Sequence, residues 1–527
     1  MNGIAWLLAV ILAGCHRLIR CFELATSFVS NLSVIQAANM DILVDLSWHA
    51  PTSSRINSLN SAINGRGTYG FVFNSSTLPE GSSYGIVIFL SFHILVSHTY
   101  LGTYNWCNMP HARRTEYPKV NSSYDLEYVE VLHRHHKRTP YAANTFPVEG
   151  YAWYCDDEAL FYYGAPLPTH SANHSARTYW SVYTSSSNPL APRGFNGTCQ
   201  FPQITRGGLD DSWQHGIDLY GVYHDLLGFL PEKYDPSTVS FRVTNNVITS
   251  QVASMVTSGM FGGEAHQNSA LLVQPASIDS LEPAYTCSTA TNNFSAYGVG
   301  SNDSGWTSHL NAASELFASL DTISGVSPTD SGFHTSFDHY FDNLSARLCH
   351  AKPLPCNISN PSLCVTQAMA DEVFRLGQYE YSYLYRDAGA RTLEYSAGKY
   401  GIWVAELAQN LRHAMHATDS ASTGKGTSSG IRYRHNIAHD GSVSYILSIL
   451  QIEQMVWPGM GSQLIFELYK KKVDQRYYIR VLWGGQVLRS SNPTLGVLDM
   501  LQVEILLAYF DGLVGQRAEK IPSICSL

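Results

Sequence analysis

The residues best suited to chemistry lie between Arg134 and Pro140, in the run Arg-His-His-Lys-Arg-Thr-Pro. Arg134 and Arg138 carry planar, permanently charged guanidinium groups whose donors match the geometry of phosphate oxygens. His135 lies between them in sequence, and a neutral imidazole beside a bound phosphate can attack phosphorus. The spacing therefore predicts a phosphate-binding loop with a histidine nucleophile. The alternative is a solvated basic turn, which so short a pattern does not exclude.

A second polar pair, His439 and Asp440, follows a short run that begins at Tyr433. Hydrolysis of a phosphate ester needs a proton for the leaving oxygen, and Asp440 can supply it where its surroundings keep it protonated. His439 can add a donor to the phosphate oxygens. The two segments together offer the cations, the nucleophile and the proton donor that this reaction requires.

Both motifs are predicted to follow β-strands. Residues 126–132 form an apolar, β-branched run of strand length, and a strand is also expected just before His439. Further strand-like runs occur at 238–243, 462–469 and 476–488, with helical periodicity between them. This alternation predicts an α/β fold with a doubly wound, mainly parallel sheet flanked by helices. Sites in such sheets lie beyond the carboxyl ends of the strands, where both motifs are expected.

The chain is predicted to have three parts. Residues 1–23 hold an apolar run of signal-peptide length and are interpreted as a signal peptide or leader. Residues 24–103 are predicted to form an N-terminal arm, and 104–527 the α/β domain. Helical insertions are expected at about 150–235 and 288–360, and they predict a smaller, mostly helical cap domain.

The apolar run at 85–98 is out of place in a stretch rich in Ser, Thr, Tyr and Asn. It is shorter than the ~20 residues that a transmembrane helix needs, so no stable membrane span is expected. We interpret it as a gene-model error such as a translated intron. The alternative is a buried strand.

The composition indicates a globular protein with a large core, since 45% of the 527 residues are hydrophobic and 14% are charged. The net charge of -9 argues against nucleic acid as a partner, because binding a phosphate backbone needs a basic surface. A small phosphomonoester in a local basic pocket remains compatible with that charge. The predicted chemistry requires no cofactor, and the sequence leaves a homo-oligomer open.

The cysteines and sequons predict a secreted, extracellular glycoprotein, with cell-wall association as an alternative. The chain has ten cysteines and no C-x-x-C pair, which argues against a zinc ribbon. The eight cysteines outside the leader predict up to four disulfides, whose pairing the sequence leaves open. N-glycans are predicted at Asn-x-Ser/Thr sequons. The sequons lie at Asn31, Asn74, Asn121, Asn173, Asn196, Asn293, Asn302, Asn343 and Asn357.

These motifs resemble those of the histidine acid phosphatases, branch 2 of the histidine phosphatase superfamily. The Arg-His-x-x-Arg-x-Pro pattern that begins at Arg134 precedes the His439-Asp440 pair, as in the family. The turn Gln203–Gly208 resembles the family's Leu-Thr-x-x-Gly turn, and 457–469 resembles its substrate-side strand. The similarity covers about 104–515 and is greatest to secreted fungal acid phosphatases, which are related to fungal phytases.

The resemblance implies an acid phosphatase that hydrolyses phosphate monoesters through a phosphohistidine at His135, with Asp440 as proton donor. The alternatives are a phytase or inositol-polyphosphate phosphatase, and a catalytically weak secreted or cell-wall glycoprotein that keeps the fold. His136 replaces a glycine that is common in the family, although its backbone carbonyl can still accept from the nucleophile's ring. The family's third phosphate-binding arginine aligns with Asn246, and Arg242 is predicted to replace it.

The density of histidines raises the question of a metal site. His133 and His135 alternate along the expected strand, with His136 next to them and His435 expected nearby. No carboxylate follows at ligand spacing, and the interleaved arginines would repel a divalent cation. We therefore predict no metal site. His215, on a predicted amphipathic helix, is interpreted as a packing residue.

Overall fold

The computed structural model leaves several of the sequence predictions outside the residues it describes. The predicted leader at 1–23, the run at 85–98 and the sequons at Asn31, Asn74 and Asn173 are among them. None of the helices in the described part is both long and apolar enough to cross a membrane. The described residues are 32–37, 40–68, 106–155, 161–162, 178–180, 182–183, 185, 187–190, 193–262, 269–422 and 430–526.

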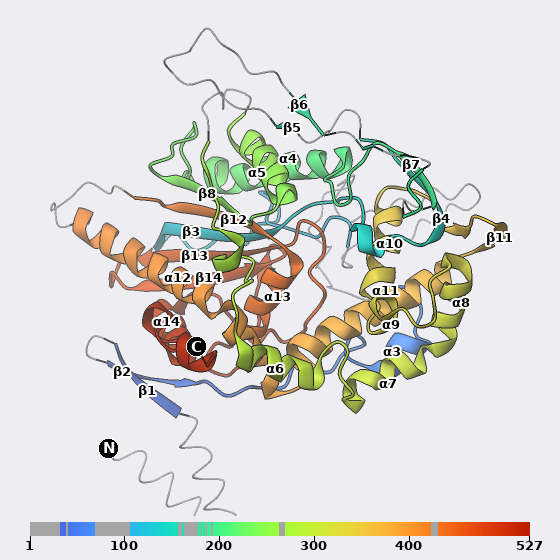
Figure 1. The fold of residues 1–527 in the computed structure, drawn as a ribbon. Coiled ribbons are helices and arrows are strands. Elements are labelled where there is room, and N and C mark those ends of the chain that lie inside the picture. Colours follow the sequence, from blue (N-terminus) through green and yellow to red (C-terminus); the bar gives the residue numbers. More distant parts are fainter. Residues whose placement is uncertain are drawn as a thin grey trace, which may run out of the picture.

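An eight-stranded sheet forms the centre of the molecule (Figure 1). Its order is β15-β14-β13-β3-β12-β8-β9, with β16 beside β14. Strands β3, β12, β8 and β9 pair in parallel, and β13 lies antiparallel between β3 and β14. Five of the eight strands (β3, β12, β8, β9 and β14) therefore run in one direction, which confirms the predicted α/β fold with a mainly parallel sheet. The bounds are β3 (Tyr124–Arg134), β8 (Val239–Val243), β9 (Leu271–Leu272), β12 (Tyr433–Ala438), β13 (Gln463–Lys471), β14 (Tyr477–Trp483), β15 (Gln486–Val487) and β16 (Leu501–Gln502).

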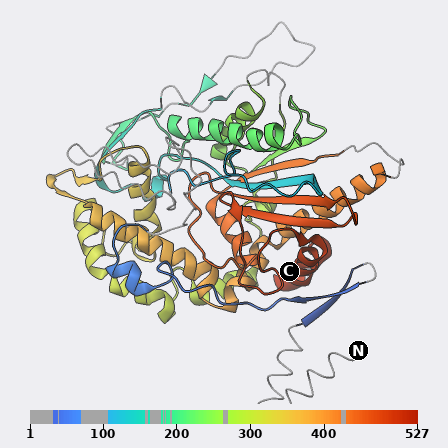
Figure 2. The same ribbon diagram turned by 180° about the vertical axis from the view of Figure 1, so that it is seen from behind.

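Helices cover both faces of the sheet, as Figures 1 and 2 show. Side chains alternate along β3, so Val129 and Val131 join the core under α4 and α5. Tyr128 and Leu132 join the opposite core with α12, α13 and α14. Burial on both faces explains why this strand is a nearly continuous apolar run. The helices are α4 (Arg206–Tyr220), α5 (Val247–Phe261), α12 (Ala390–Ser422), α13 (Asp440–Ile449) and α14 (Val503–Val514).

A helical lobe, defined here as α7 to α11, lies beside the sheet (Figure 1). It has a core of its own, in which the rings of Phe317 and Phe337 stack with centroids 4.4 Å apart. The segment 288–360 contains α6 (Ser288–Tyr297) and the lobe helices α7 to α10. The lobe consists of α7 (Ser304–Ala312), α8 (Ser314–Ser324), α9 (Ser331–His334), α10 (Asp338–Cys349) and α11 (Gln367–Ser382), and α3 (Leu59–Asn64) contacts α11.

The segment 150–235 differs from the predicted helical insertion. Its described residues before α4 contribute short strands, and helix begins only at Arg206. These strands belong partly to a four-stranded sheet of order β11-β10-β4-β7, because backbone from 148–153 pairs with both 193–197 and 357. The bounds are β4 (Val148–Trp153), β7 (Arg193–Gly197), β10 (Cys356–Asn357) and β11 (Asn360–Cys364).

Four disulfides join cysteines whose pairing could not be predicted from the sequence. The longest connections tie the segment before β3 to α10 and the start of α6 to the C-terminal residues. They fix the lobe and α6 to the sheet domain by covalent bonds. No cysteine in the described ranges is unpaired. The pairs are Cys107–Cys349, Cys155–Cys199, Cys287–Cys525 and Cys356–Cys364.

One predicted glycosylation site is buried. Asn343 has 1% of its surface exposed, and its Nδ2 donates to the carbonyl of Asn144 and to Glu149 Oε1, each at 3.0 Å. A glycan must be attached to this same nitrogen and needs open space, so the folded chain excludes it at Asn343 and that prediction is wrong. Asn121, Asn196 and Asn302 are exposed, and glycans there stay predictions.

A buried carboxylate in β13 depends on its neighbours for charge compensation. Glu467 is fully buried, and it accepts hydrogen bonds from Tyr117 (2.7 Å), Tyr223 (2.6 Å) and Arg480 Nε (2.7 Å). Arg480 is itself buried and supplies the only formal positive charge among these donors. The ion pair is therefore buried at a place where water cannot replace either partner.

Replacing Arg480 tests this dependence. Arg480→Met is expected to lower the free energy of unfolding by about 3–5 kcal/mol, because Glu467 becomes an uncompensated buried charge. Lys471→Met is the matched control, since it removes a partly exposed cation near Asp474 and should cost less than about 1 kcal/mol. Urea unfolding of both variants measures the difference. Equal losses in the two variants would contradict the argument.

Candidate functional site

The two sequence motifs meet at the carboxyl edge of the sheet. Strands β3 and β12 are parallel neighbours in which Arg134 is paired with Ala438, so the next residues of each chain segment leave the sheet side by side. The His135 amide donates to the Ala438 carbonyl at 3.0 Å, and the Gly461 amide donates to the His135 carbonyl at 3.0 Å. His135 is thus held on both sides by backbone, directly beside His439.

The ring of His135 has one nitrogen fixed and the other free for chemistry. Its Nδ1 lies 3.0 Å from the His136 carbonyl, which can only accept, so Nδ1 carries the proton and Nε2 keeps its lone pair. Burial and the charges of Arg134 and Arg138 hold the pKa of His135 well below its ordinary value. The ring is therefore neutral even in acid. The carbonyl at position 136 makes the contact expected from the resemblance, although its residue is not glycine.

Two buried arginines flank this ring, and each keeps an unused donor. Arg134 Nη2 lies 3.3 Å from Asp440 Oδ2, and Nη1 donates to the Pro458 carbonyl. Arg138 Nη1 donates to Asp342 Oδ1 at 2.9 Å. The Nε atoms of both arginines are buried without a hydrogen-bond partner. Buried donors of this kind are rare in proteins, and charged ones are suited to an anion.

Asp440 is the carboxylate of the cluster. Its Oδ2 accepts from Trp457 Nε1 at 2.7 Å and from the Tyr381 hydroxyl at 3.2 Å. Burial raises the pKa of Asp440, but the Arg134 charge, the Trp457 hydrogen bond and the charges of His439 and Arg138 outweigh it, so the pKa lies below its ordinary value. These contacts favour the ionised form of the carboxyl in the free protein.

Thr244, which follows a third strand, β8, completes the cluster by contacting His439. The ring of His439 lies 5.3 Å from that of His135, and its Nε2 is 3.0 Å from Thr244 Oγ1 and 3.3 Å from Glu282 Oε2. Thr244 follows β8, which neighbours β12. Thr244 and Asp342 were not predicted as site residues from the sequence, and Trp457 was predicted only as part of the segment 457–469 that resembles a substrate-side strand. Thr244 lies between Arg242 and Asn246, so its position in the sequence could have indicated it. Asp342 and Trp457 reach the site from a lobe helix and a loop.

The structure does not bring Arg242 to this cluster. Its guanidinium binds Asp279 at 3.1 Å and Glu406 at 2.8 Å. Asn246 is the N-cap of α5, where its side chain accepts from the Ile248 amide at 3.2 Å. The predicted replacement of the third arginine by Arg242 is therefore unsupported, and the Asn246 side chain already serves the helix.

A group of histidines lies behind the nucleophile loop. His136 Nε2 is 3.1 Å from His133 Nε2 and 3.1 Å from His215 Nδ1. His133 Nδ1 is 3.1 Å from His435 Nε2. Burial lowers the pKa of His133, His136 and His215 well below the ordinary value. His215 is therefore more than a packing residue, and these three rings form the group whose ligand atoms could hold a metal in the part that the structure describes.

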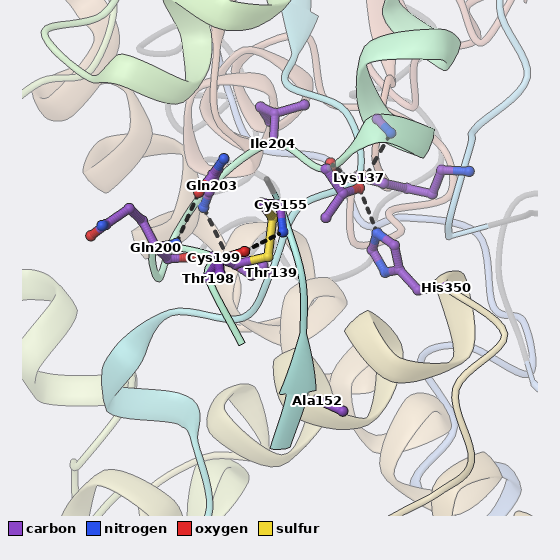
Figure 3. The surroundings of a disulfide bond; sticks show 12 residues. Lys137, Thr139, Ala152, Cys155, Thr198, Cys199, Gln200, Gln203, Ile204 and His350 are labelled. Carbon is purple, nitrogen blue, oxygen red and sulfur yellow. Dashed lines mark hydrogen bonds between the residues drawn. A yellow bond between two sulfur atoms is a disulfide. The ribbon is translucent and has the colours of Figure 1, made fainter. Parts of the chain in front are cut away.

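The turn before α4 supports the nucleophile loop from outside. Thr139 Oγ1 donates to the Gln200 carbonyl at 2.8 Å, and the Gln203 amide donates to Thr139 Oγ1 at 3.0 Å, next to the Cys155–Cys199 disulfide (Figure 3). Thr205 caps α4, and a Cβ on Gly208 would stand 2.0 Å from the Lys137 carbonyl oxygen. Only glycine allows the helix so close to the loop.

A second carboxyl near the cluster behaves oppositely to Asp440. Asp338 begins α10, and burial together with the charges of Asp342, Asp440 and Glu380 raises its pKa to about 7. Two carboxyls in one neighbourhood thus have pKa values shifted in opposite directions, which is an arrangement typical of acid–base sites. Asp338 therefore keeps its proton to higher pH than Asp440 does.

Comparison with known proteins gives one family. Residues 376–483 match the sequence model of the histidine phosphatase superfamily, branch 2. The match confirms the family expected from the motifs over the part of the chain that carries β12 and the His439-Asp440 pair. The arginine loop lies outside the matched residues.

The chain has only distant similarity to individual proteins. A probable acid phosphatase of Dictyostelium discoideum is 25% identical over 170 residues, which cover 31% of this chain and 30% of the relative's length. A phytase from Hafnia alvei has a TM-score of 0.46 at 13% identity, covering 78% of this chain and 100% of its own. A phytase from D. castellii has a TM-score of 0.43 at 14% identity, covering 87% and 93%.

The close approach at Gly208 can be tested by adding one methyl group. Gly208→Ala is expected to destabilise the chain by about 1–3 kcal/mol, because the backbone of Lys137 must move. Gly207→Ala is the control, since its Cβ would meet only the flexible end of the Lys137 side chain at 3.5 Å. Thermal unfolding measures the stability of both variants. The rise in unfolding midpoint on adding inorganic phosphate reports whether the loop still binds the anion. A Gly208→Ala variant as stable as Gly207→Ala would refute the packing argument.

The raised pKa of Asp338 predicts a pH-dependent effect on stability. A carboxyl whose pKa is higher in the folded state stabilises the fold below its unfolded pKa of 3.8, and this contribution is lost as pH rises through about 7. Asp338→Asn should therefore leave the unfolding midpoint nearly unchanged at about pH 4 and raise it at about pH 8. Thermal unfolding at both pH values measures this. The exposed Asp210→Asn control should show no such difference, and a flat Asp338→Asn profile would contradict the prediction.

Proposed function

We propose that this chain is an acid phosphatase that hydrolyses phosphate monoesters through a phosphohistidine at His135. The observation that carries the proposal is a neutral His135, with Nε2 free, between two buried arginines whose Nε donors are unused. A dianionic phosphoryl group satisfies those donors and balances the two charges. The family match over 376–483 supports phosphatase chemistry at the same site.

Each step of the proposed reaction has a residue to perform it. Arg134 and Arg138 bind the phosphoryl oxygens, and His135 Nε2 attacks phosphorus while the bond to the ester oxygen breaks. Asp440 gives its proton to the leaving alkoxide. Water then attacks the phosphohistidine and returns a proton to Asp440, so that inorganic phosphate leaves and His135 is free again. His439 donates to a phosphoryl oxygen from the third strand end.

The proton on Asp440 must arrive with the substrate. The arginines keep this carboxyl ionised in the free protein, but a bound phosphate dianion offsets their charges and raises its pKa. Substrate and proton therefore bind together, which favours acidic conditions. The lowered pKa of His135 keeps the nucleophile unprotonated under the same conditions. A carboxyl whose pKa rises when the dianion binds and an imidazole whose pKa is low can therefore act as acid and nucleophile at the same acidic pH.

We propose a simple monoester rather than an inositol polyphosphate as substrate. A polyphosphate needs additional cations around the phosphoryl group, yet Arg242 binds Asp279 and Glu406, and Lys137 binds Asp211 at 2.9 Å. Asn246 offers no charge in the third arginine position. The phytase alternative from the sequence thus lacks support from these side chains.

We also propose that the helical lobe is a cap domain of a secreted glycoprotein. Asp342 on α10 holds Arg138, and Glu149 pairs with Arg347 of the same helix, so the lobe helps to position the phosphate loop. Four disulfides suit an oxidising compartment. The exposed sequons are the proposed carriers of N-glycans.

Turnover of an aryl phosphate at acidic pH tests the reaction. His135→Ala is expected to abolish it, and Asp440→Asn to reduce kcat by about 10²–10⁴-fold. The loss in Asp440→Asn should be greater for an alkyl phosphate than for a nitrophenyl phosphate, because a poorer leaving group depends more on the proton. Incorporation of ³²P into wild-type enzyme quenched in alkali, where a phosphohistidine survives, and its absence in His135→Ala would identify the intermediate.

Two residues away from the site, one exposed and one half-buried, supply matched controls. His224→Ala and Asp210→Asn change the same residue types outside the site and should retain wild-type turnover. An absence of turnover between about pH 3 and 7 in correctly folded wild-type protein would overturn the proposal and favour the catalytically weak glycoprotein. Full activity in His135→Ala would refute the assigned nucleophile.

A further inference from the structure

We propose that His133, His136 and His215 bind one divalent transition-metal ion of the zinc class, behind the loop that carries His135. The three rings come from strand β3, the loop after it and helix α4, and all three are completely or almost completely buried. Neutral imidazole nitrogens are preferred ligands of zinc, cobalt and copper. Such an ion would be structural, and it lies outside the proposed phosphatase reaction.

The positions of the nitrogens fit a metal ion. His136 Nε2 is 3.1 Å from both His133 Nε2 and His215 Nδ1, and the three ligand atoms all lie within 4.8 Å of one another. Two nitrogens bound tetrahedrally to zinc, each at about 2.0–2.1 Å, are about 3.3 Å apart. The observed contacts are near this value, so a small adjustment of the rings brings three lone pairs onto one point.

Hydrogen bonds alone do not satisfy all three ring nitrogens that come together at His136 Nε2. His136 Nε2 has a single in-plane position, which holds either one proton or one lone pair. It faces two nitrogens at the same distance, and with either tautomer one position must be shared between two partners. A metal ion removes the conflict, because each of the three nitrogens can then direct its own lone pair to the ion.

The remaining ring nitrogens already have the partners that metal-bound histidines need. His133 Nδ1 is 3.1 Å from His435 Nε2, and His215 Nε2 is 2.8 Å from Gln463 Oε1. Both partners can accept the proton that a metal-bound ring keeps on its other nitrogen. Contacts of this kind orient ligands in known metal sites.

The third ring points its outer nitrogen toward another unsatisfied atom. His136 Nδ1 and Asn108 Oδ1 are both buried without a hydrogen-bond partner. They lie 2.8 and 3.3 Å from the point where a Cβ on Gly461 would stand. In the metal-bound tautomer Nδ1 is a donor and Oδ1 an acceptor, so the two can pair directly or through one water. The proposal thus accounts for two orphaned atoms at once.

The strand geometry answers the objection from the neighbouring arginines. Alternation along β3 directs Arg134 toward Asp440, while His133 packs against His215 and His435. Arg138 is paired with Asp342, and Lys137 with Asp211. The charges that appeared interleaved in sequence are therefore turned away or compensated. They therefore no longer argue against a metal ion at this position.

An ion here would fix the nucleophile loop. The carbonyl of His136 receives the His135 Nδ1 hydrogen bond, so holding the His136 ring also holds that carbonyl. The histidines are buried, and an ion must therefore enter while the chain folds. Loss of the ion is expected to lower the unfolding midpoint by about 2–5 °C.

Metal content of the full-length protein tests the proposal without an activity assay. The protein should be produced in zinc-supplemented medium, and separately refolded with Co²⁺ as a spectroscopic probe. We expect about one zinc per chain after extensive dialysis. X-ray absorption of that zinc should show nitrogen or oxygen ligands at about 2.0–2.1 Å with the scattering pattern of imidazole. The Co²⁺ form should show the visible absorption of a low-coordinate nitrogen site.

Variants assign the ion to these residues. His136→Gln and His215→Gln should each lose most of the zinc. His309→Gln is the control, because His309 is equally buried but bonds Glu380 in the helical lobe, and it should keep one equivalent. Wild-type protein with less than about 0.1 equivalent, or full zinc content in both ligand variants, would overturn the proposal. If the ligand variants do not fold, the wild-type zinc content and X-ray absorption decide alone.

Discussion

The parallel pairing of β3 with β12 is the constraint on which the site depends. Backbone hydrogen bonds place Arg134 opposite Ala438, and parallel strands release their carboxyl ends at the same edge. Segments that are 300 residues apart in sequence therefore leave the sheet together. β8 adds a third end, from which Thr244 contacts His439. The backbone ladder thus fixes the relative positions of His135 and Asp440, the proposed nucleophile and proton donor, before any side chain is considered.

Alternation of side chains along β3 then separates two kinds of polar group. Arg134 lies on the side of Asp440, where charges of opposite sign compensate one another without water. His133 lies on the side of α4, where neutral rings pack against neutral rings. Both sides are buried, so each polar group needs a partner, and the groups without one are informative. The unused Nε donors of the two motif arginines suit an anion, and the imidazole nitrogens that meet on the opposite side are the proposed ligands of a cation.

Burial also adjusts the protonation states that the chemistry needs. The same arginine charges that lower the pKa of His135 also lower that of Asp440. At Asp338, burial and the charges of neighbouring carboxylates outweigh the charge of Arg138, so the pKa of this carboxyl is raised instead. One charge distribution therefore maintains a neutral nucleophile and an ionised carboxyl. A bound dianion would reverse the balance at Asp440, which couples the proton to the substrate.

The sequence alone determined the strands, the α/β class and the two motifs, because hydrophobic periodicity and motif spacing are local properties. That the two motifs lie close together could be predicted because sites in parallel sheets lie beyond the carboxyl ends of the strands. Only the tertiary structure revealed that Asp342 holds Arg138, that Arg242 is bound elsewhere and that His215 meets His133 and His136. Each of these depends on contacts between distant segments, and on which face of an element a side chain occupies after packing. Residue types and spacing do not contain that information, so a histidine that was interpreted as packing became part of a three-histidine group.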